Sequence, residues 1–196
     1  MTSSSVIVGD DGRARCAWAG HDAEYRRYHD EEWGTPLHGD RALFEKLSLE
    51  GFQAGLSWIT ILRRRPTFRL AFAGFDIDAI AAFDEDDVER LMVDPGIIRN
   101  RLKVDATISN ARVTQQLLSG HPGALDELIW SYAPTPREHV LATSDELPAV
   151  TPDSTALSTA LKKLGYRFVG PTTMYALMQS GGLVDDHVAG CWRASS

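Results

Sequence analysis

Two sets of side chains in this sequence have types and spacings that could support chemistry, and the first surrounds a carboxylate. Glu50 follows Leu43 and Leu47 at helical spacing and therefore shares the apolar face of one predicted helix. An acid beside several rings is typical of a pocket for a flat, hydrogen-bonding or cationic ring. Two other interpretations remain: Glu50 bends out to water or pairs with an arginine, and the rings only form core. The large aromatic residues near this acid in the sequence are Trp18, Tyr25, Tyr28, Trp33 and Trp58.

The second set is built from the two cysteines of the chain and two histidines. Cys16 and His29 lie near the start, whereas His187 and Cys191 lie near the end, with an i, i+4 spacing that places both on one face of a helix. Two thiolates and two imidazoles complete a tetrahedral zinc site and leave no position for a catalytic water, so the ion would be structural. Two alternatives remain open: an unrelated placement of the four residues, and a disulfide, which a reducing cytoplasm disfavours.

A third segment has the pattern of a phosphate-binding turn between helices. The sequence of residues 87–112 indicates two helices joined by a turn at Gly96, for which we expect a positive φ. Backbone amides at the start of the second helix, reinforced by Arg99, Arg101 and Lys103, could bind a phosphate. A Pro-Gly turn is equally common between helices of any all-α protein.

The pattern of the whole chain predicts an all-α fold that must position these residues. Apolar-periodic segments begin at an Asp or Ser and end at Gly or Pro. The longest helix is predicted over 100–118 and another over 155–164, which Gly165 can end. The helix that begins at Ser57 is expected to stop before Pro66. The predicted N-caps are Asp40, Ser57, Asp76, Asp84 and Ser154.

Other segments are predicted to lie outside helices. Only 6–8 and 166–169 have β-like patterns, and 133–152, which holds four prolines, is predicted as a long connection. The start of the chain has no periodicity, so we expect a mobile tail there. The predicted organisation is an N-terminal tail, a single domain and a C-terminal tail, over 1–14, 15–192 and 193–196.

Composition limits the possible classes of protein. A chain of 196 residues with 43% hydrophobic content can form one domain or two lobes that share a cleft. A net charge of -7 argues against a whole-surface nucleic-acid binder, so any DNA contact must come from a local patch, for which the arginines at 63–65 are a further candidate. Val6–Val8 is too short for a signal-peptide core and no apolar run approaches membrane length, so we expect a cytoplasmic protein.

Together, these motifs resemble the 3-methyladenine DNA glycosylase I family, within the helix-hairpin-helix glycosylase superfamily. The similarity is collinear and covers nearly everything except the tails. Its most specific parts are the run from Glu50 to Trp58 and the two terminal pairs of cysteine and histidine. The matching runs are Arg15-Cys16, 28–34, 49–51, 53–58, 96–99, 168–170, 186–188 and Cys191.

The resemblance implies an all-α helix-hairpin-helix fold in which two helical lobes flank a base-binding cleft. It implies one structural Zn²⁺ per chain that joins the two ends and is bound by Cys16, His29, His187 and Cys191. It also implies that Glu50 hydrogen-bonds an extruded adenine, which packs against Trp18, Tyr25, Tyr28, Trp33 and Trp58. The hairpin would contact the DNA backbone through Gly96, Ile98, Arg99, Arg101 and Lys103.

The implied activity is monofunctional hydrolysis of the N-glycosidic bond of 3-methyladenine in alkylated double-stranded DNA, which starts base excision repair. We expect a monomer, and the extent of activity on 3-methylguanine stays open. Two features depart from the superfamily pattern: the hairpin has only Gly96 where many relatives have two glycines, and neither a lysine nucleophile nor the distal aspartate can be placed. Methylation at N3 already makes the base a good leaving group, so extruding, holding and selecting it are the main tasks.

Two other classes of function stay open at this point. A zinc-dependent protein could bind damaged bases in DNA without cleaving them. A metallohydrolase would use His29 and His187 on an open zinc, and ligation by both cysteines would exclude it because no catalytic position would remain.

Overall fold

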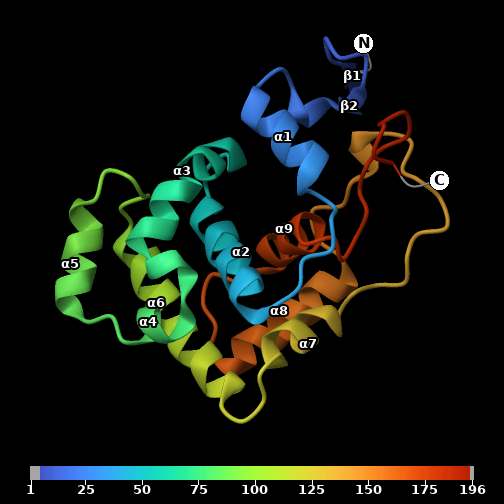
Figure 1. Ribbon diagram of the computed structural model, residues 1–196. Coiled ribbons are helices and arrows are strands. Elements are labelled where there is room, and N and C mark those ends of the chain that lie inside the picture. Colours follow the sequence, from blue (N-terminus) through green and yellow to red (C-terminus); the bar gives the residue numbers. More distant parts are fainter. Residues whose placement is uncertain (1–4, 195–196) are drawn as a thin grey trace.

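The computed structural model describes residues 5–194 and is mostly helical, as predicted (Figure 1). Helix α2 lies at the centre, between a group formed by α3 to α6 and a group formed by α7 to α9. The elements are β1 Val6–Val8, β2 Ala14–Cys16, α1 Ala23–Glu31, α2 Asp40–Gln53, α3 Trp58–Ala71, α4 Ile77–Ala81, α5 Glu85–Val93, α6 Arg101–Leu118, α7 Ala124–Trp130, α8 Pro152–Leu164 and α9 Pro171–Ser180. Short 3-10 turns lie at Ala17–Ala19, Ala73–Phe75 and Ser144–Glu146.

Helix α2 is buried around its circumference, which agrees with its central position. Its residues 46–52 are all buried, and they include the polar side chains of Lys46, Ser48 and Glu50. A helix without a solvated face must satisfy such side chains inside the protein. The acid that the sequence placed on an apolar face is therefore an interior residue.

Local capping signals placed several helix ends correctly. Asp76 and Asp84 accept hydrogen bonds from amides in the first turns of α4 and α5. Gly165 ends α8 with a φ of 100° that favours glycine. These predictions are confirmed because a cap acts within one turn of its own helix and needs no distant partner.

The prediction that α3 stops before Pro66 is wrong. The helix continues through Pro66 to Ala71, although proline removes one backbone hydrogen bond from a helix interior. Ile61 and Phe68, on either side of the proline, are fully buried in the core. Their packing outweighs the local penalty and holds the helix together.

Three predicted caps act differently from the prediction. The Asp40 carboxylate accepts hydrogen bonds from three amides at the start of α7, the nearest at 2.7 Å, although Asp40 is itself the first residue of α2. The Ser57 hydroxyl bonds to Thr60 Oγ1 at 2.8 Å instead of to a backbone amide. The N-cap of α8 is Thr151, and Ser154 completes its capping box from the third helical position.

The described part of the predicted N-terminal tail, residues 5–14, belongs to the fold. Val6–Val8 pair antiparallel with Ala14–Cys16, and Val6 lies opposite Cys16. Gly12, with a φ of 76°, lies in the turn that joins the strands. The prediction of a tail is therefore wrong over this range, because the segment that looked flexible closes a β-hairpin. Residues 1–4 lie outside the described residues.

The C-terminal segment returns to this hairpin (Figure 1). The Trp192 amide donates to the Ala14 carbonyl at 2.8 Å. Arg193, which was predicted to begin a tail, donates to Thr35 Oγ1 at 3.0 Å, while residues 195–196 lie outside the described range. The two ends of the domain are therefore held side by side.

The segment between α7 and α8 is the long connection that the sequence predicted, interrupted only by a 3-10 turn at Ser144–Glu146. Residues 166–169, the second β-like run, form no strand. Within residues 5–194, no helix combines the length and the apolar character needed to cross a membrane.

Candidate active site and metal centre

One cavity of about 280 Å³ gathers the residues that the sequence predicted to bind a base. Glu50 and all five predicted rings line it, although they come from five separate segments of the chain. The central helix α2 supplies the acid, and α1 and the segments that flank it supply most of the rings. The lining residues are Trp18, Tyr25, Tyr28, Trp33, Glu50, Gln53, Trp58, Leu147, Ala176, Gln179 and Ser180.

The rings around this cavity support one another by edge-to-face and tilted contacts. The centroid of Trp18 lies 5.0 Å from that of Trp33 and 5.3 Å from that of Tyr25. On the other side, Tyr28 and Trp58 lie 5.5 Å apart. Such contacts fix the orientation of each ring, so the walls are rigid and aromatic before any ligand enters.

Glu50 is a buried acid with one hydrogen bond in the described structure. Glu50 is only 3% exposed, and its Oε1 accepts a hydrogen bond from Ser180 Oγ at 2.8 Å. Burial raises the pKa of Glu50 to about 7, while the charge of Lys46 and the Ser180 hydrogen bond act in the opposite direction. The carboxylate form is therefore accessible at neutral pH, and Glu50 lines the cavity in that form.

A candidate metal centre lies next to this cavity, where the N-terminal hairpin and α1 meet the C-terminal segment. Ligand atoms of Cys16, His29 and Cys191 all lie within 4.8 Å of one another, and Cys191 Sγ is 3.4 Å from His29 Nε2. The fourth predicted ligand, His187, stands outside this group of three. Its ring centroid lies 5.0 Å from that of His29, and its Nε2 is buried without a hydrogen-bond partner in the described chain.

Both histidines are oriented by a neighbouring carboxylate. Asp30 Oδ1 lies 2.8 Å from Nδ1 of His29, and Asp185 Oδ1 lies 2.7 Å from Nδ1 of His187. A carboxylate on Nδ1 leaves Nε2 as the coordinating atom, which is the usual support of a metal-bound histidine. Both histidines thus offer Nε2, and the group of three could hold a metal ion through two sulfur atoms and one nitrogen.

The two cysteines are free thiols in the structure, not a disulfide. A hydrogen bond from Cys16 lowers the pKa of Cys191 to about 4 against the effect of burial, and His29 adds to this effect. The same hydrogen bond, together with burial, raises the pKa of Cys16.

The sequence was wrong about how His187 and Cys191 come together. Residues 181–194 contain no helix, so the i, i+4 spacing does not act through a helical face. Instead, a turn in which the Cys191 amide donates to the Val188 carbonyl at 3.0 Å brings the two residues to the hairpin. Gly190, with a φ of 86°, lies in this turn.

The segment 94–100 joins α5 to α6 without the backbone conformation that the sequence predicted. Gly96 does not have a positive φ, and that prediction is wrong. A Cβ at Gly96 would lie 2.9 Å from Thr67 Cβ, so glycine is needed here because α3 approaches closely. Arg64 of α3 also donates to the Pro95 carbonyl at 2.7 Å.

Of the residues predicted to contact a DNA backbone, Lys103 is contradicted by its position. It is buried, and Nζ donates to the carbonyl oxygens of Phe52 and Ala54 at 2.8 and 2.6 Å, so it completes the C-terminal end of α2. Arg101 is exposed but paired with Glu85 at 2.6 Å. Arg99 is exposed and Ile98 partly buried at the start of α6, so these two remain candidates.

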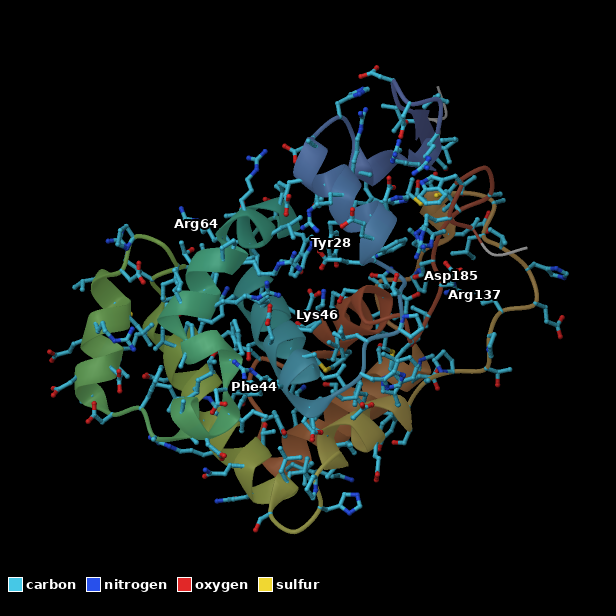
Figure 2. All side chains as sticks on the ribbon, in the orientation of Figure 1. Tyr28, Phe44, Lys46, Arg64, Arg137 and Asp185 are labelled. Carbon is cyan, nitrogen blue, oxygen red and sulfur yellow. The ribbon has the colours of Figure 1, made fainter. Side chains whose placement is uncertain are left out.

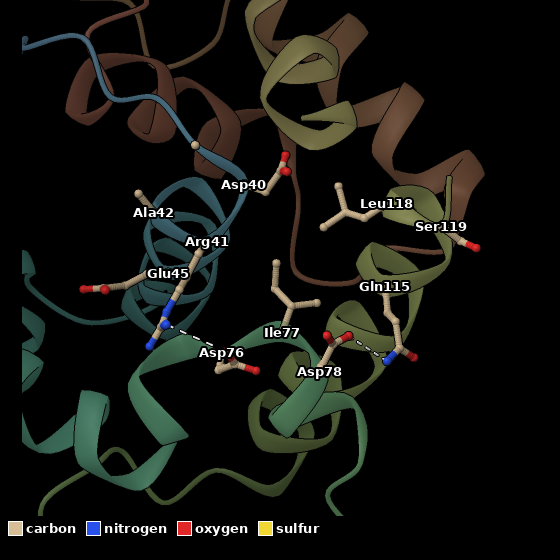
Figure 3. Close-up of a pocket in the computed structure, with 11 residues that line it drawn as sticks. Asp40, Arg41, Ala42, Glu45, Asp76, Ile77, Asp78, Gln115, Leu118 and Ser119 are labelled. Atoms are coloured by element: carbon tan, nitrogen blue, oxygen red, sulfur yellow. Dashed lines mark hydrogen bonds and ion pairs between the residues drawn. The ribbon is translucent and has the colours of Figure 1, made fainter. Parts of the chain in front are cut away.

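A second and larger hollow, of about 920 Å³, lies elsewhere between α2, α4 and α6 (Figure 3). Two pairs of its lining side chains interact with each other: Arg41 with Asp76 at 3.7 Å and Gln115 with Asp78 at 2.8 Å. It contains none of the site residues predicted from the sequence. The smaller cavity beside Glu50 is therefore the candidate active site.

Sequence reasoning missed several residues of the site. Ser180 and Gln179 reach the cavity from α9 and Leu147 from the long connection, and no local pattern links them to Glu50. Lys46 could have been found, because it lies one helical turn before Glu50. The same is true of Asp30, which directly follows His29.

Comparison with known proteins adds to this geometry. The model of the methyladenine glycosylase family matches residues 18–194. DNA-3-methyladenine glycosylase 1 of Escherichia coli K12 is 48% identical over 179 residues, which is 90% of this chain and 95% of that protein. DNA-3-methyladenine glycosylase of Haemophilus influenzae is 44% identical over 182 residues, or 90% and 96% of the two chains.

Solved structures agree with this similarity. A crystal structure of 3-methyladenine DNA glycosylase I matches with a TM-score of 0.89 and 46% identity, covering 92% of this chain and 100% of that one. A Staphylococcus aureus 3-methyladenine DNA glycosylase I, solved to explain its recognition of 3-methyladenine, matches with a TM-score of 0.86 and 33% identity over 93% and 97% of the two chains.

Proposed function

Since the chain belongs to the methyladenine glycosylase family, we propose that it excises 3-methyladenine from alkylated DNA by hydrolysing the N-glycosidic bond. The observation that carries this proposal is the buried Glu50 in an aromatic cavity of about 280 Å³. A cavity with this lining suits a flat base removed from the DNA stack, because its rings can pack on the base while its polar groups read the base edge.

The chemistry follows from the charge of the substrate. Methylation at N3 gives the base a positive charge, so the bond between C1′ and N9 can break with its electron pair moving to the base. Water then forms a bond to C1′ and loses a proton, which leaves an abasic site. The Glu50 carboxylate, with Oε2 as hydrogen-bond acceptor, and the surrounding rings favour a cationic base over a neutral one.

The DNA must be bound around the mouth of this cavity. The proposed backbone contact is the turn between α5 and α6, with Gly96, Ile98 and Arg99, as a helix-hairpin-helix element. A helix start with free amides and a nearby cation attracts a phosphate. Arg101 is a weaker candidate because Glu85 already neutralises it. Double-stranded DNA is the proposed partner, since extrusion selects a base that pairs and stacks poorly.

The proposed metal is a structural zinc ion, one per chain, held by Cys16, His29, His187 and Cys191. The unpartnered Nε2 of His187 beside the cluster of three supports the four-ligand set. Such an ion would join the β-hairpin and α1 to the C-terminal segment. A metallohydrolase is disfavoured, because a set with both sulfur atoms leaves no position for a catalytic water.

The proposal is tested by mass spectrometry of the bases released from methylated DNA. Release of 3-methyladenine above the spontaneous rate is expected from the wild-type protein, and the same assay measures any 3-methylguanine. Tight binding of methylated DNA without base release would instead indicate a protein that recognises the lesion and does not cleave it.

A further inference from the structure

Lys46 is a buried cation that the proposed function does not yet use. It lies on α2 one turn before Glu50 and is only 7% exposed. Its Nζ lies 5.2 Å from the ring centroid of Tyr28, which is labelled beside it in Figure 2, and 5.5 Å from that of Trp58. Both rings line the cavity that holds Glu50. The ammonium group therefore lies behind two walls of the candidate base pocket.

Lys46 has no salt bridge in the part of the chain that the structure describes. The charged groups that act on it are Glu50, Glu32, Arg65 and Glu45. Two of these acids have cationic partners of their own: Glu32 binds Arg65 at 2.7 Å, and Glu45 binds Arg69 at 2.8 Å. Glu50 has none.

A buried ammonium destabilises a protein unless rings or an opposite charge compensate for its lost hydration. Tyr28 and Trp58 supply the rings. Glu50 is the remaining source of negative charge, so Lys46 and Glu50 act as a pair along one face of α2.

Few other groups can influence the charge of Glu50. Tyr25 and Tyr28 face it from α1, and burial and its negative charge both raise their pKa values, so they remain neutral phenols. Ser180 faces it from α9 as a neutral hydrogen-bond donor. Lys46 is the cation that opposes the effect of burial on Glu50. Without this charge, Glu50 would hold its proton to a higher pH. A protonated Glu50 could not attract a cationic base by its charge.

We propose that Lys46 is a positioning residue for base excision: its buried ammonium group holds Glu50 in the carboxylate form and supports the Tyr28 and Trp58 rings from outside the pocket. The rings lie between this cation and the cationic base, so the two positive charges do not meet directly. This inference rests on the proposed role of Glu50 and extends it to the residue that sets its charge.

The first test is the pH profile of base release by Lys46→Met, a variant of similar shape without the charge. The midpoint of the rise in kcat/KM with pH is expected to move upward by about 1 unit, so that release falls about 10-fold below the midpoint and recovers in alkaline solution. Lys46→Arg is expected to restore the midpoint. Lys162→Met, which removes an exposed charge from α8, is the matched control and should keep the wild-type profile. An unchanged midpoint in Lys46→Met would overturn the proposal.

A second test does not depend on catalysis. The carbon-13 signal of the Glu50 carboxyl group, titrated in the free protein, is expected to show a higher pKa in Lys46→Met than in the wild type. The wild-type protein alone gives a further test if that variant does not fold: the Lys46 side-chain signals must shift as Glu50 titrates, and signals that stay constant overturn the proposal.

The two proposals can fail separately. Loss of base release in Glu50→Gln together with an unchanged Glu50 titration in Lys46→Met would overturn the role of Lys46 alone. Full base release by Glu50→Gln would overturn the proposed role of Glu50. The proposed role of Lys46 would then fail as well, because it depends on the charge of Glu50.

Discussion

The Ser180 hydroxyl donates a hydrogen bond to Glu50 Oε1 at 2.8 Å and joins residues that are 130 positions apart in the sequence. Ser180 is the last residue of α9, whereas Glu50 lies near the end of the central helix α2. The bond satisfies one oxygen of a buried carboxylate, and both residues line the candidate active-site cavity. Four measurements follow from this arrangement and from the surrounding contacts.

Replacing Glu50 by Gln is expected to lower base release about 100-fold or more, because a neutral amide cannot favour a cationic base. The same change should also alter how the stability of the protein depends on pH. The pKa of Glu50 in the folded protein is raised from 4.5 to about 7, so the wild type loses stability as the pH rises through that window. Glu50→Gln should lack this loss, which corresponds to about 1–3 kcal/mol at pH 8. Thermal unfolding at pH 5 and pH 8 measures the difference, and an equal pH dependence in both proteins would contradict the expectation.

Removing the Ser180 hydroxyl should lower base release through its effect on the pKa of Glu50. Ser180→Ala takes away a hydrogen bond that favours the carboxylate, so the pKa of Glu50 should rise further. Base release is expected to fall about 10-fold at pH 7 and to recover partly at pH 8.5. Ser180→Thr keeps a hydroxyl and serves as the control. A loss that is the same at both pH values would show that Ser180 contributes packing only.

Removal of the proposed zinc ion should destabilise the protein. Cys191→Ser is expected to bind less than one zinc per chain by elemental analysis and to lose more than about 3 kcal/mol of the free energy of unfolding, because metal-binding energy contributes directly to folding. His139→Gln, at an exposed histidine of the long connection, is the matched control and should keep one zinc. Equal stability of the wild type with and without a chelator would contradict a structural role for the metal.

Lys103, in the first turn of α6, and Arg99, two residues before that helix, should behave in opposite ways. Lys103→Met breaks two hydrogen bonds to carbonyls at the end of α2 and is expected to reduce stability by about 2–4 kcal/mol. Arg99→Ala should leave stability nearly unchanged and weaken DNA binding, with the salt dependence of log K reduced by about 1. Binding isotherms at several salt concentrations separate the two effects. A reduced salt dependence in Lys103→Met would place that lysine at the DNA after all.

Features that depend on neighbours in the sequence could be predicted from the sequence alone. Asp76, Asp84 and Gly165 act on their own helix ends, so their residue types were sufficient. The periodicity that placed Glu50 on an apolar face was also local, and the structure confirms that this acid is buried. The resemblance to a family supplied the group of rings and the ligand set, which spacing alone left among several alternatives.

Only the tertiary structure decided which distant groups meet. Helix α3 continues through Pro66 because its neighbours are buried in the core, and Asp40 caps a helix more than 80 residues further along the chain. Lys103 points inward because the carbonyls at the end of α2 lie beside it. The partner of Glu50 is fixed by the packing of α9 on α2, which no local pattern reveals. Such contacts depend on how many residues pack together in the core at once. A local stretch of sequence therefore cannot show which distant residues will meet.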